Sequence, residues 1–239
     1  MNAHHEFAPG LFTQGLTTPL RLSDHRLIAF DMDSTLINIE CIDEIADAVG
    51  KKAEVAAITE ATMRGDITDF KESLRRRVAL LRGVALSDLQ QVLDQRLQLN
   101  PGAEALLAAC RAAGLRTVLV SGGFTFFAQA VQQRLQIDVM RSNELAVQGG
   151  KLTGELVQQS WGDICDGEEK RRTVLAECER LGCSPAQAIA VGDGSNDIPM
   201  MQACGLSVAY HAKPRVREQA RICIDAGGLD RLLEVVRPS

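Results

Sequence analysis

An apolar run followed at once by two aspartates occurs in the stretch Leu27-Ile-Ala-Phe-Asp-Met-Asp-Ser-Thr-Leu36. The four apolar residues predict a short buried strand, because polar residues bound them on both sides. Asp31 and Asp33 would then lie at the carboxyl end of that strand, where open α/β sheets bind their ligands. Two like charges buried together are unfavourable unless a cation or a reaction requires them. An Asp-rich turn is the alternative explanation, and two further segments of the chain weaken it.

Two later apolar runs end in a similar way. In Thr117-Val-Leu-Val-Ser-Gly-Gly-Phe124 a hydroxyl and two glycines follow the strand, and glycines let backbone N–H groups approach an anion closely. In Ala188-Ile-Ala-Val-Gly-Asp-Gly-Ser-Asn-Asp197 the strand end is more polar than a tight turn requires. Asp193 and Asp197 would share one face if the chain turns helical there. Three such strand ends at one sheet edge predict a site for phosphate and a metal ion.

The rest of the pattern alternates between strand and helix, with one interruption. Residues 38–97 contain no convincing strand, and their spacing predicts helices over 40–49, 51–63, 68–81 and 87–97. We expect this all-helical insert to form a cap domain. Beyond it, a helix is predicted from Asn100-Pro101 to Gly114, because Asn can cap a helix and Pro suits its first turn. A hairpin is predicted over 144–148 and 151–156, followed by strands near 188–192, 206–210 and 222–224.

These elements predict an α/β fold, with a parallel sheet covered by helices on both faces. The core would comprise residues 23–37 and 98–239, and the cap residues 38–97. Residues 1–22 are expected to be a loosely ordered arm.

Composition restricts the classes of partner and compartment. The formal net charge is −5 over 239 residues, which argues against a nucleic-acid partner held by phosphate contacts. Seven cysteines without Cys-x-x-Cys spacing indicate reduced thiols in the cytoplasm rather than a disulfide framework or a zinc site. The first twenty residues do not read as a signal peptide, and no apolar run approaches the length of a membrane span.

Four features together resemble the motifs of the haloacid dehalogenase superfamily of phosphohydrolases. They are Asp31-Met-Asp-Ser-Thr35, the strand end at Ser121, the isolated Lys170, and Gly192-Asp193-Gly-Ser-Asn-Asp197. On its own, the charged run of residues 167–172 around Lys170 would indicate a solvated helix face. Within the superfamily, residues 30–40, 74–78, 121–124 and 191–197 resemble the phosphoserine phosphatases, and the likeness runs from Leu27 to the C-terminus. The resemblance implies a Rossmann-like doubly wound core.

The resemblance also implies a reaction, which is Mg²⁺-dependent hydrolysis of O-phosphoserine through an aspartyl-phosphate. Asp31 would be the nucleophile, since a carboxylate is already ionised at neutral pH and needs no separate base. Asp33 would protonate the leaving alcohol and then activate water. The metal ligands would be Asp31, Asp193 and a main-chain oxygen of Asp33, since oxygen-only ligands favour Mg²⁺ over zinc.

The remaining roles follow from the same resemblance. Ser121 and the N–H of Gly122 would hold phosphoryl oxygens, and Lys170 would neutralise the charge that accumulates there. Asp197 would orient Lys170, while Asn196 would contact the phosphate or metal-bound water.

Substrate choice is assigned to the cap. Glu40 and Arg77 resemble the family's pair for the ammonium and carboxylate of phosphoserine, and Met63 and Phe70 resemble its apolar pocket lining. Without the resemblance, Glu40 would be a surface residue at a helix start and Arg77 one of three adjacent arginines.

Several alternatives stay open at this level. The enzyme could pass its phosphoryl group to another alcohol such as homoserine, or hydrolyse another phosphorylated amino compound. A signalling receiver domain is a different class, but it would lack the insert over residues 38–97 and would not need the second acid, Asp33. A homodimer is also left open.

Overall fold

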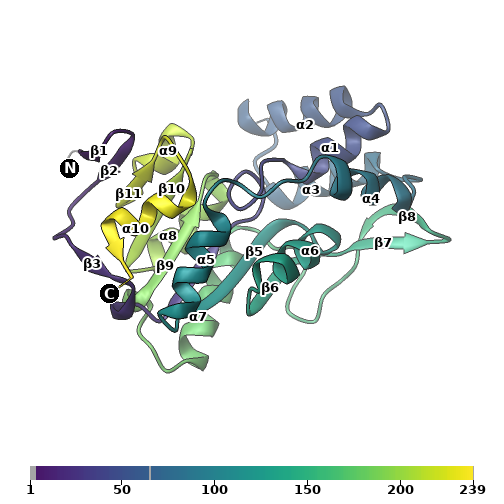
Figure 1. The fold of residues 1–239 in the computed structure, drawn as a ribbon. Helices are drawn as coiled ribbons and strands as arrows, with labels where there is room; N and C mark the ends of the chain where they lie inside the picture. Colours follow the sequence, from purple (N-terminus) through teal and green to yellow (C-terminus); the bar gives the residue numbers. More distant parts are fainter. Residues whose placement is uncertain (1–3, 65, 239) are drawn as a thin grey trace.

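The computed structural model describes residues 4–64 and 66–238, and for Met63 it describes the backbone alone. A sheet of eight strands runs through the molecule in the order β1-β2-β11-β10-β9-β4-β5-β6 (Figure 1). The strands are β1 (His5–Ala8), β2 (Leu11–Thr13), β4 (Leu27–Phe30), β5 (Arg116–Phe124), β6 (Val139–Asn143), β9 (Ala188–Gly192), β10 (Leu206–Tyr210) and β11 (Ile222–Ile224).

Strand β4 lies at the centre of this sheet, between β9 and β5, and is parallel to both. All four of its residues are buried. Ile28 and Phe30 pack into the core on one face of the sheet, whereas Leu27 and Ala29 pack on the other. A strand covered on both faces must be apolar at every position, and each large side chain buried there contributes about 1.5–3 kcal/mol. The predicted doubly wound α/β fold is confirmed.

Within the described part of the chain, six helices accompany the sheet in the core. They are α5 (Ala103–Ala112), α6 (Thr125–Leu135), α7 (Gly167–Arg180), α8 (Ile198–Ala203), α9 (Pro214–Arg217) and α10 (Leu232–Val235). The short elements are η1 (Leu22–Asp24), η2 (Pro185–Gln187), η3 (Ser195–Asp197), η4 (Leu229–Arg231), and the parallel pair β3 (Leu20–Arg21) and β12 (Val236–Arg237). None of the described helices has the length and apolar character needed to cross a membrane.

Four further helices form the cap, which lies to one side of the sheet in Figure 1. They are α1 (Cys41–Ala48), α2 (Lys52–Arg64), α3 (Phe70–Leu80) and α4 (Leu86–Gln95). The predicted helical insert is therefore present, with ends that differ from the predicted ones by a few residues. Helix α3 begins at an N-cap, because the Asp69 carboxylate accepts the N–H of Lys71 at 2.9 Å.

The cap is joined to the core by two adjacent chain segments. Ile37 and Leu99 form an antiparallel bridge between them. The N–H of Asn38 donates to the Gln98 carbonyl at 3.0 Å, and the N–H of Gln98 donates to the Asn38 side chain at 2.8 Å. These hydrogen bonds hold the entry and exit of the insert together.

The predicted hairpin is confirmed as β7 (Leu145–Gln148) and β8 (Lys151–Leu156). Its position is less obvious from sequence. By chain order it belongs to the core, but it also packs against the cap. The N–H of Gly83 donates to the carbonyl of Leu152, and the N–H of Leu152 donates to that of Val84, both at 2.8 Å. The division into core and cap at residues 37 and 98 stays a prediction, with this hairpin shared between them.

Three predicted details are wrong. The arm over 1–22 is not loosely ordered where it is described, since β2 pairs antiparallel with β11 and buries Leu11 completely. Helix α5 begins after Gly102, whose φ of 78° suits glycine, and not at Asn100. The Asn100 amide instead donates to the carbonyls of Thr35 at 2.8 Å and Ile37 at 3.0 Å. Strand β5 does not end at Ser121 but continues to Phe124 with irregular pairing to β6.

Candidate active site

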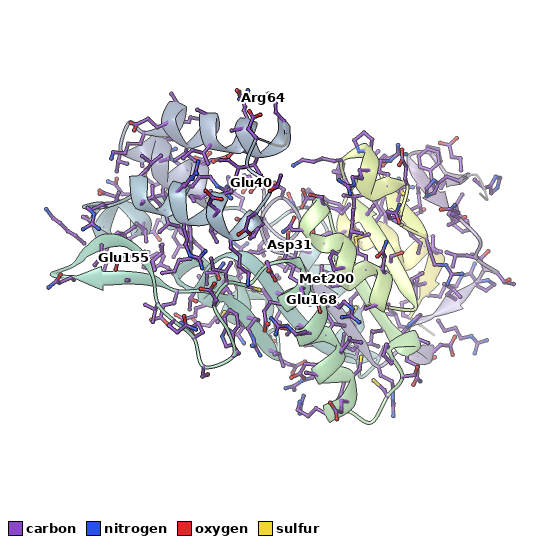
Figure 2. The ribbon with its side chains drawn as sticks, turned by 180° about the vertical axis from the view of Figure 1, so that it is seen from behind. Asp31, Glu40, Arg64, Glu155, Glu168 and Met200 are labelled. Carbon is purple, nitrogen blue, oxygen red and sulfur yellow. The ribbon has the colours of Figure 1, made fainter. Side chains whose placement is uncertain are left out.

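The carboxyl ends of β4, β5 and β9 bring the predicted polar residues together. Phe30 of β4 lies level with Leu119 of β5 and with Val191 of β9, so the next residues of all three strands meet at one edge. Figure 2 shows Asp31 at this edge, with Glu40 of the cap above it. The register of three parallel strands therefore builds the site.

A buried lysine lies at the centre of the acidic residues. The Lys170 ammonium lies 2.6 Å from Oδ1 of Asp31 and 2.6 Å from Oδ1 of Asp197. Lys170 has no exposed surface and Asp31 is 6% exposed. The solvated helix face that the charged run indicates is thus wrong for Lys170, because α7 turns this residue towards the sheet.

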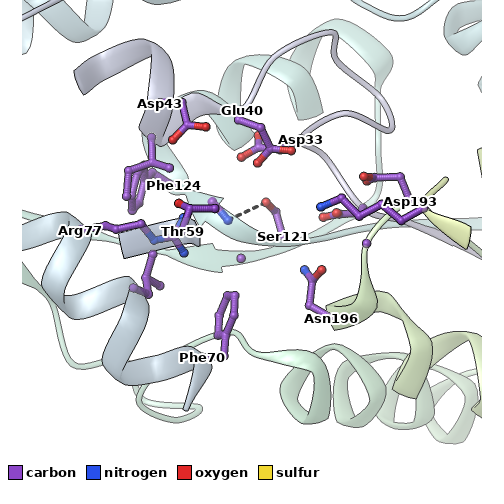
Figure 3. Close-up of a pocket in the computed structure, with 17 residues that line it drawn as sticks. Asp33, Glu40, Asp43, Thr59, Phe70, Arg77, Ser121, Phe124, Asp193 and Asn196 are labelled. Atoms are coloured by element: carbon purple, nitrogen blue, oxygen red, sulfur yellow. Dashed lines mark hydrogen bonds between the residues drawn. The ribbon is translucent and has the colours of Figure 1, made fainter. Parts of the chain in front are cut away.

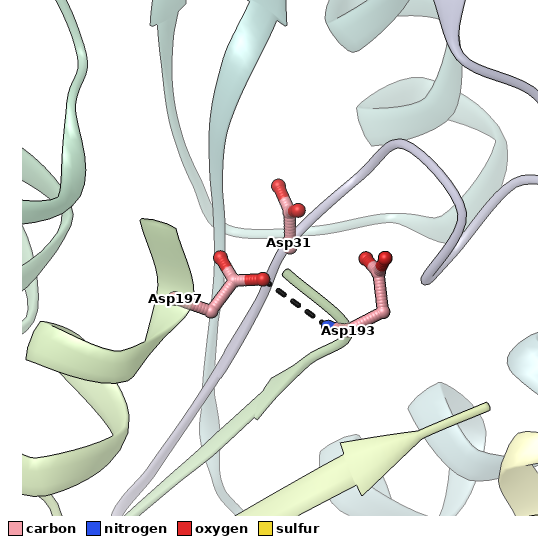
Figure 4. Close-up of side chains that lie close together, drawn as sticks. All are labelled: Asp31, Asp193 and Asp197. Carbon is pink, nitrogen blue, oxygen red and sulfur yellow. Dashed lines mark hydrogen bonds between the residues drawn. The ribbon is translucent and has the colours of Figure 1, made fainter. Parts of the chain in front are cut away.

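Asp197 fixes the loop that follows β9. Its Oδ2 accepts the N–H of Asp193 at 3.1 Å (Figure 4) and that of Gly194 at 3.0 Å. Its Oδ1 accepts a hydrogen bond from the Lys170 ammonium at 2.6 Å. A Cβ at Gly192 would lie 2.5 Å from the Asp197 carboxyl carbon, so glycine is required at that position. Every polar atom of the Asp197 side chain has a protein partner.

Asp31, Asp193 and Asp197 form an acidic cluster in which one carboxylate oxygen from each lies within 4.8 Å of the others. Burial, together with the charge of Asp197, raises the pKa of Asp31 well above its usual value and that of Asp193 to about 7. The Thr35 hydroxyl donates to Asp193 at 3.0 Å, which favours the charged form. A hard divalent cation binds carboxylate oxygens and would offset the repulsion between them, so this cluster suits such a cation.

Asp33 sits where the core meets the cap. Its carboxylate accepts the N–H of Cys41 at 3.3 Å and the thiol of Cys41 at 3.1 Å. Burial, and next the charge of Glu40, raise the pKa of Asp33 to about 7. A carboxyl group with such a pKa can both donate and accept a proton near neutral pH. Cys41 carries no sequence signal for this contact beyond its place at the start of α1.

The turn at Ser121, which is predicted to bind phosphoryl oxygens, lines the same cavity as these acids. The Ser121 hydroxyl accepts the N–H of Gly123 at 2.8 Å. The buried Asn143 fixes the turn, since its amide donates to the carbonyl of Gly122 at 2.8 Å and accepts the N–H of Cys165 at 2.8 Å. Asn143 is a supporting residue that sequence reasoning did not identify, because its partners are main-chain groups.

A cavity of about 250 Å³ joins this edge to the cap (Figure 3). Its core side contains the acids and the turn at Ser121, and its cap side contains charged and apolar side chains. The lining residues from the prediction are Asp31, Asp33, Glu40, Phe70, Arg77, Ser121, Gly122, Asp193 and Asn196. Asp43, Thr59 and Lys213 also line it and were not predicted. The Met63 side chain lies outside the described part of the chain.

The three adjacent arginines of α3 have different environments. Arg75 pairs with Asp163, and Arg76 pairs with Glu72 on the same helix. Arg77 lines the cavity, and its buried Nε has no partner in the structure. Of the three arginines, Arg77 is the one that lines this cavity, and its role in substrate binding stays a prediction.

The sequence of this chain is similar to those of known hydrolases. The family model of the haloacid dehalogenase-like hydrolases matches residues 28–202. The phosphoserine phosphatase of Albidiferax ferrireducens is 65% identical over 231 residues, which cover 97% of this chain and 98% of that protein. That of a Polaromonas species is 64% identical, with the same two shares covered.

Solved structures give the same picture. A substrate-bound phosphoserine phosphatase complex is 35% identical, covers 89% of this chain and 99% of its own, and superimposes with a TM-score of 0.81. A phospho-aspartyl intermediate analogue of phosphoserine phosphatase has the same identity, coverage and TM-score.

Proposed function

The chain belongs to the phosphoserine phosphatases of the haloacid dehalogenase-like hydrolase family, and we propose from this premise that its cavity hydrolyses O-phosphoserine to serine and phosphate. The observation that carries the proposal is that one cavity contains a nucleophile paired with a lysine and, on the cap side, an acid and an arginine. The four cap helices and the second acid, Asp33, argue against a signalling receiver.

The first half of the reaction follows from the core residues. The phosphoryl group enters between Asp31 and the turn at Ser121, where the hydroxyl and the N–H of Gly122 bind its oxygens. An Asp31 oxygen forms a bond to phosphorus as the bond from phosphorus to the serine oxygen breaks. Protonated Asp33 gives its proton to the serine oxygen, and serine leaves.

The second half releases phosphate. Asp33 is now a carboxylate and takes a proton from the water that attacks the phosphorus of the aspartyl-phosphate. The bond from phosphorus to Asp31 breaks, and both acids return to their starting state. The Lys170 ammonium lies 2.6 Å from Asp31, so its charge would offset the negative charge that gathers on the phosphoryl oxygens.

The acidic cluster fits a divalent cation, and we propose that it is Mg²⁺. Both Asp197 oxygens already have protein partners, which leaves the Asp31 and Asp193 side chains as ligands, with a main-chain oxygen of Asp33 as a further one. When bound, the cation would reduce the repulsion between the Asp31 carboxylate and the incoming phosphate.

Recognition of the amino acid is assigned to the cap. Arg77 would bind the carboxylate of phosphoserine and Glu40 its ammonium, with Phe70 against the apolar part. Glu40 at present accepts the Ser34 hydroxyl at 2.7 Å, a contact that an ammonium group can share. We also propose that this reaction completes serine formation in the cytoplasm, in keeping with seven free cysteines.

A phosphate-release screen tests the proposal. Phosphoserine, phosphothreonine, phosphoethanolamine and sugar phosphates would be compared with Mg²⁺ present, with and without homoserine as an acceptor alcohol. We expect a clear preference for phosphoserine, unchanged phosphate release with homoserine, and loss of activity by at least about 10⁴-fold in Asp31→Asn. Transfer of phosphate to homoserine, or full activity in Asp31→Asn, would contradict the proposal.

A further inference from the structure

Two opposite charges in the cap half of the cavity have buried atoms without partners. They are Oδ1 of Asp43 and Nε of Arg77, and both residues line the cavity. No hydrogen bond or ion pair connects the two residues in the structure. A buried polar atom without a partner is costly, so two of opposite sign facing one cavity need an explanation.

The other acids near Arg77 are already engaged. Glu40 accepts the Ser34 hydroxyl, and Asp33 accepts two hydrogen bonds from Cys41. Asp43 has no such partner. It lies in the first turn of α1, and the guanidinium lies near the end of α3, so the two helices hold the charges on neighbouring walls of the cavity (Figure 3).

Electrostatics agree with this arrangement. Burial lowers the pKa of Arg77 and is the largest influence on it. The charge of Asp43 raises that pKa and comes next, ahead of the charges of Glu40 and Asp33. Burial raises the pKa of Asp43, and the charge of Arg77 is the largest influence that opposes it. The charge of Lys52 lowers the pKa of Asp43 less than that of Arg77 does, and the charge of Glu44 raises it.

We propose that Asp43 is a positioning residue for Arg77: it holds the guanidinium in the orientation that binds the carboxylate of the substrate. This inference rests on the proposed function. A guanidinium presents its donors in a fixed fork, so its orientation decides whether a carboxylate can bind through two parallel hydrogen bonds. Asp43 would accept one N–H of the fork while the substrate accepts others, and it would not touch the substrate itself.

The inference predicts a selective effect on substrate recognition. Asp43→Asn and Asp43→Ala should raise KM for phosphoserine about ten-fold and leave kcat within about two-fold, because the reacting groups are unchanged. Phosphoethanolamine keeps the phosphate and the ammonium but lacks the carboxylate, so its kcat/KM should stay within about two-fold. In an Arg77→Ala background, Asp43→Asn should have no further effect.

Stability separates positioning from a structural role. Asp43 is half-buried, and removal of its buried, unpartnered oxygen should leave the Tm unchanged or raise it, whereas loss of a structural contact would lower it. Glu54→Gln is the matched control, since it removes one exposed acid from the same cap. Asp43→Asn keeps the shape of the side chain, so it provides the measurement if Asp43→Ala does not fold.

The outcomes that overturn the inference are distinct. Equal losses on phosphoserine and phosphoethanolamine would show that Asp43 binds the ammonium or supports the fold. Additive effects of Asp43→Asn and Arg77→Ala would show that the two residues act independently. If the wild-type enzyme does not hydrolyse phosphoserine, the proposed function itself fails, which is a separate result.

Discussion

The core half and the cap half of the cavity differ in how their charges are paired. In the core half, Lys170 is buried between Asp31 and Asp197, and both ion pairs are 2.6 Å long. In the cap half, Asp43 and Arg77 each present a buried atom without a partner. The groups proposed to perform the chemistry are thus positioned before the substrate arrives, which is the arrangement that stabilises a transition state without reorganisation.

The cap half, by contrast, is completed by what it binds. A polar atom buried without a partner is costly, and the carboxylate of the substrate supplies the missing opposite charge for Arg77. The difference indicates that substitutions in the core half should damage both turnover and stability. Substitutions in the cap half should damage discrimination between substrates with little effect on stability.

Removal of the proposed metal ion should have the largest effect, because the one charge of Lys170 cannot offset all three carboxylates of the acidic cluster. A chelator should reduce phosphate release to background. Mg²⁺ at a hundred times its Kd should stabilise the enzyme by about 2.7 kcal/mol, which corresponds to a Tm higher by roughly 5–10 °C. Thermal unfolding with and without Mg²⁺ measures this shift.

Asp193→Asn should abolish that thermal shift, because it removes one carboxylate of the cluster. Asp94→Asn is the matched control, since Asp94 is exposed on α4 and contacts Gln90. Full activity in the presence of chelator would show that the acidic cluster of the core half does not need a metal ion.

Lys170→Met tests whether the core half is held by its central cation. Loss of one partner from a buried ion pair destabilises by about 3–5 kcal/mol, so the Tm should fall by roughly 6–20 °C. The kcat should fall by about 10²- to 10³-fold, since a group that offsets transition-state charge is lost. Arg171→Met on the same helix is the control, because Arg171 is exposed and pairs with Glu168. Equal Tm values for the two variants would show that the buried pairs do not stabilise the core half.

Much of the core half is predictable from sequence, and the reason is the regularity of parallel sheets. Asp31, Ser121 and Asp193 each follow an apolar run, and the carboxyl ends of parallel strands meet at one edge. Lys170 is different, because the run around it contains arginines of similar charge. Its burial depends on the rotation of α7 against the sheet, which that run does not encode.

Other features depend on contacts that leave no pattern in the sequence. Asn143 holds the site through main-chain groups, and Cys41 holds it through the carboxylate of Asp33. Strand β2 pairs with β11, about two hundred residues away in the chain, so its order is decided by a distant partner. The Pro9-Gly10 turn between β1 and β2 was the available local signal for that hairpin.

Arg77→Ala tests the opposite expectation for the cap half. Loss of a charge-assisted hydrogen bond costs about 1.5–3 kcal/mol, so kcat/KM for phosphoserine should fall by roughly 10- to 150-fold. Turnover of phosphoethanolamine should barely change, because this substrate has no carboxylate. Arg76→Ala is the matched control, since Arg76 pairs with Glu72 on its own helix. Equal losses on both substrates would show that Arg77 does not select for the carboxylate.

The smallest effect is expected where the cap contacts the core through surface charges. Lys71 of α3 lies 3.4 Å from Asp166, the N-cap of α7, and Arg75 lies 2.5 Å from Asp163. Exposed ion pairs contribute about 0–1 kcal/mol, so Lys71→Met should raise KM for phosphoserine by no more than about five-fold. Arg76→Met is the control, because the Arg76 pair lies within one helix and does not bridge cap and core.

Salt distinguishes this bridging contact from the recognition residues around it. At 1 M salt the screening length is about 3 Å, so the difference in KM between wild-type enzyme and Lys71→Met should disappear. The Arg77→Ala defect should persist under the same conditions, since buried charges are screened much less than exposed ones. KM measured across a salt series for both variants would show this. A Lys71→Met defect that is independent of salt would mean that packing, and not this ion pair, holds α3 to the core.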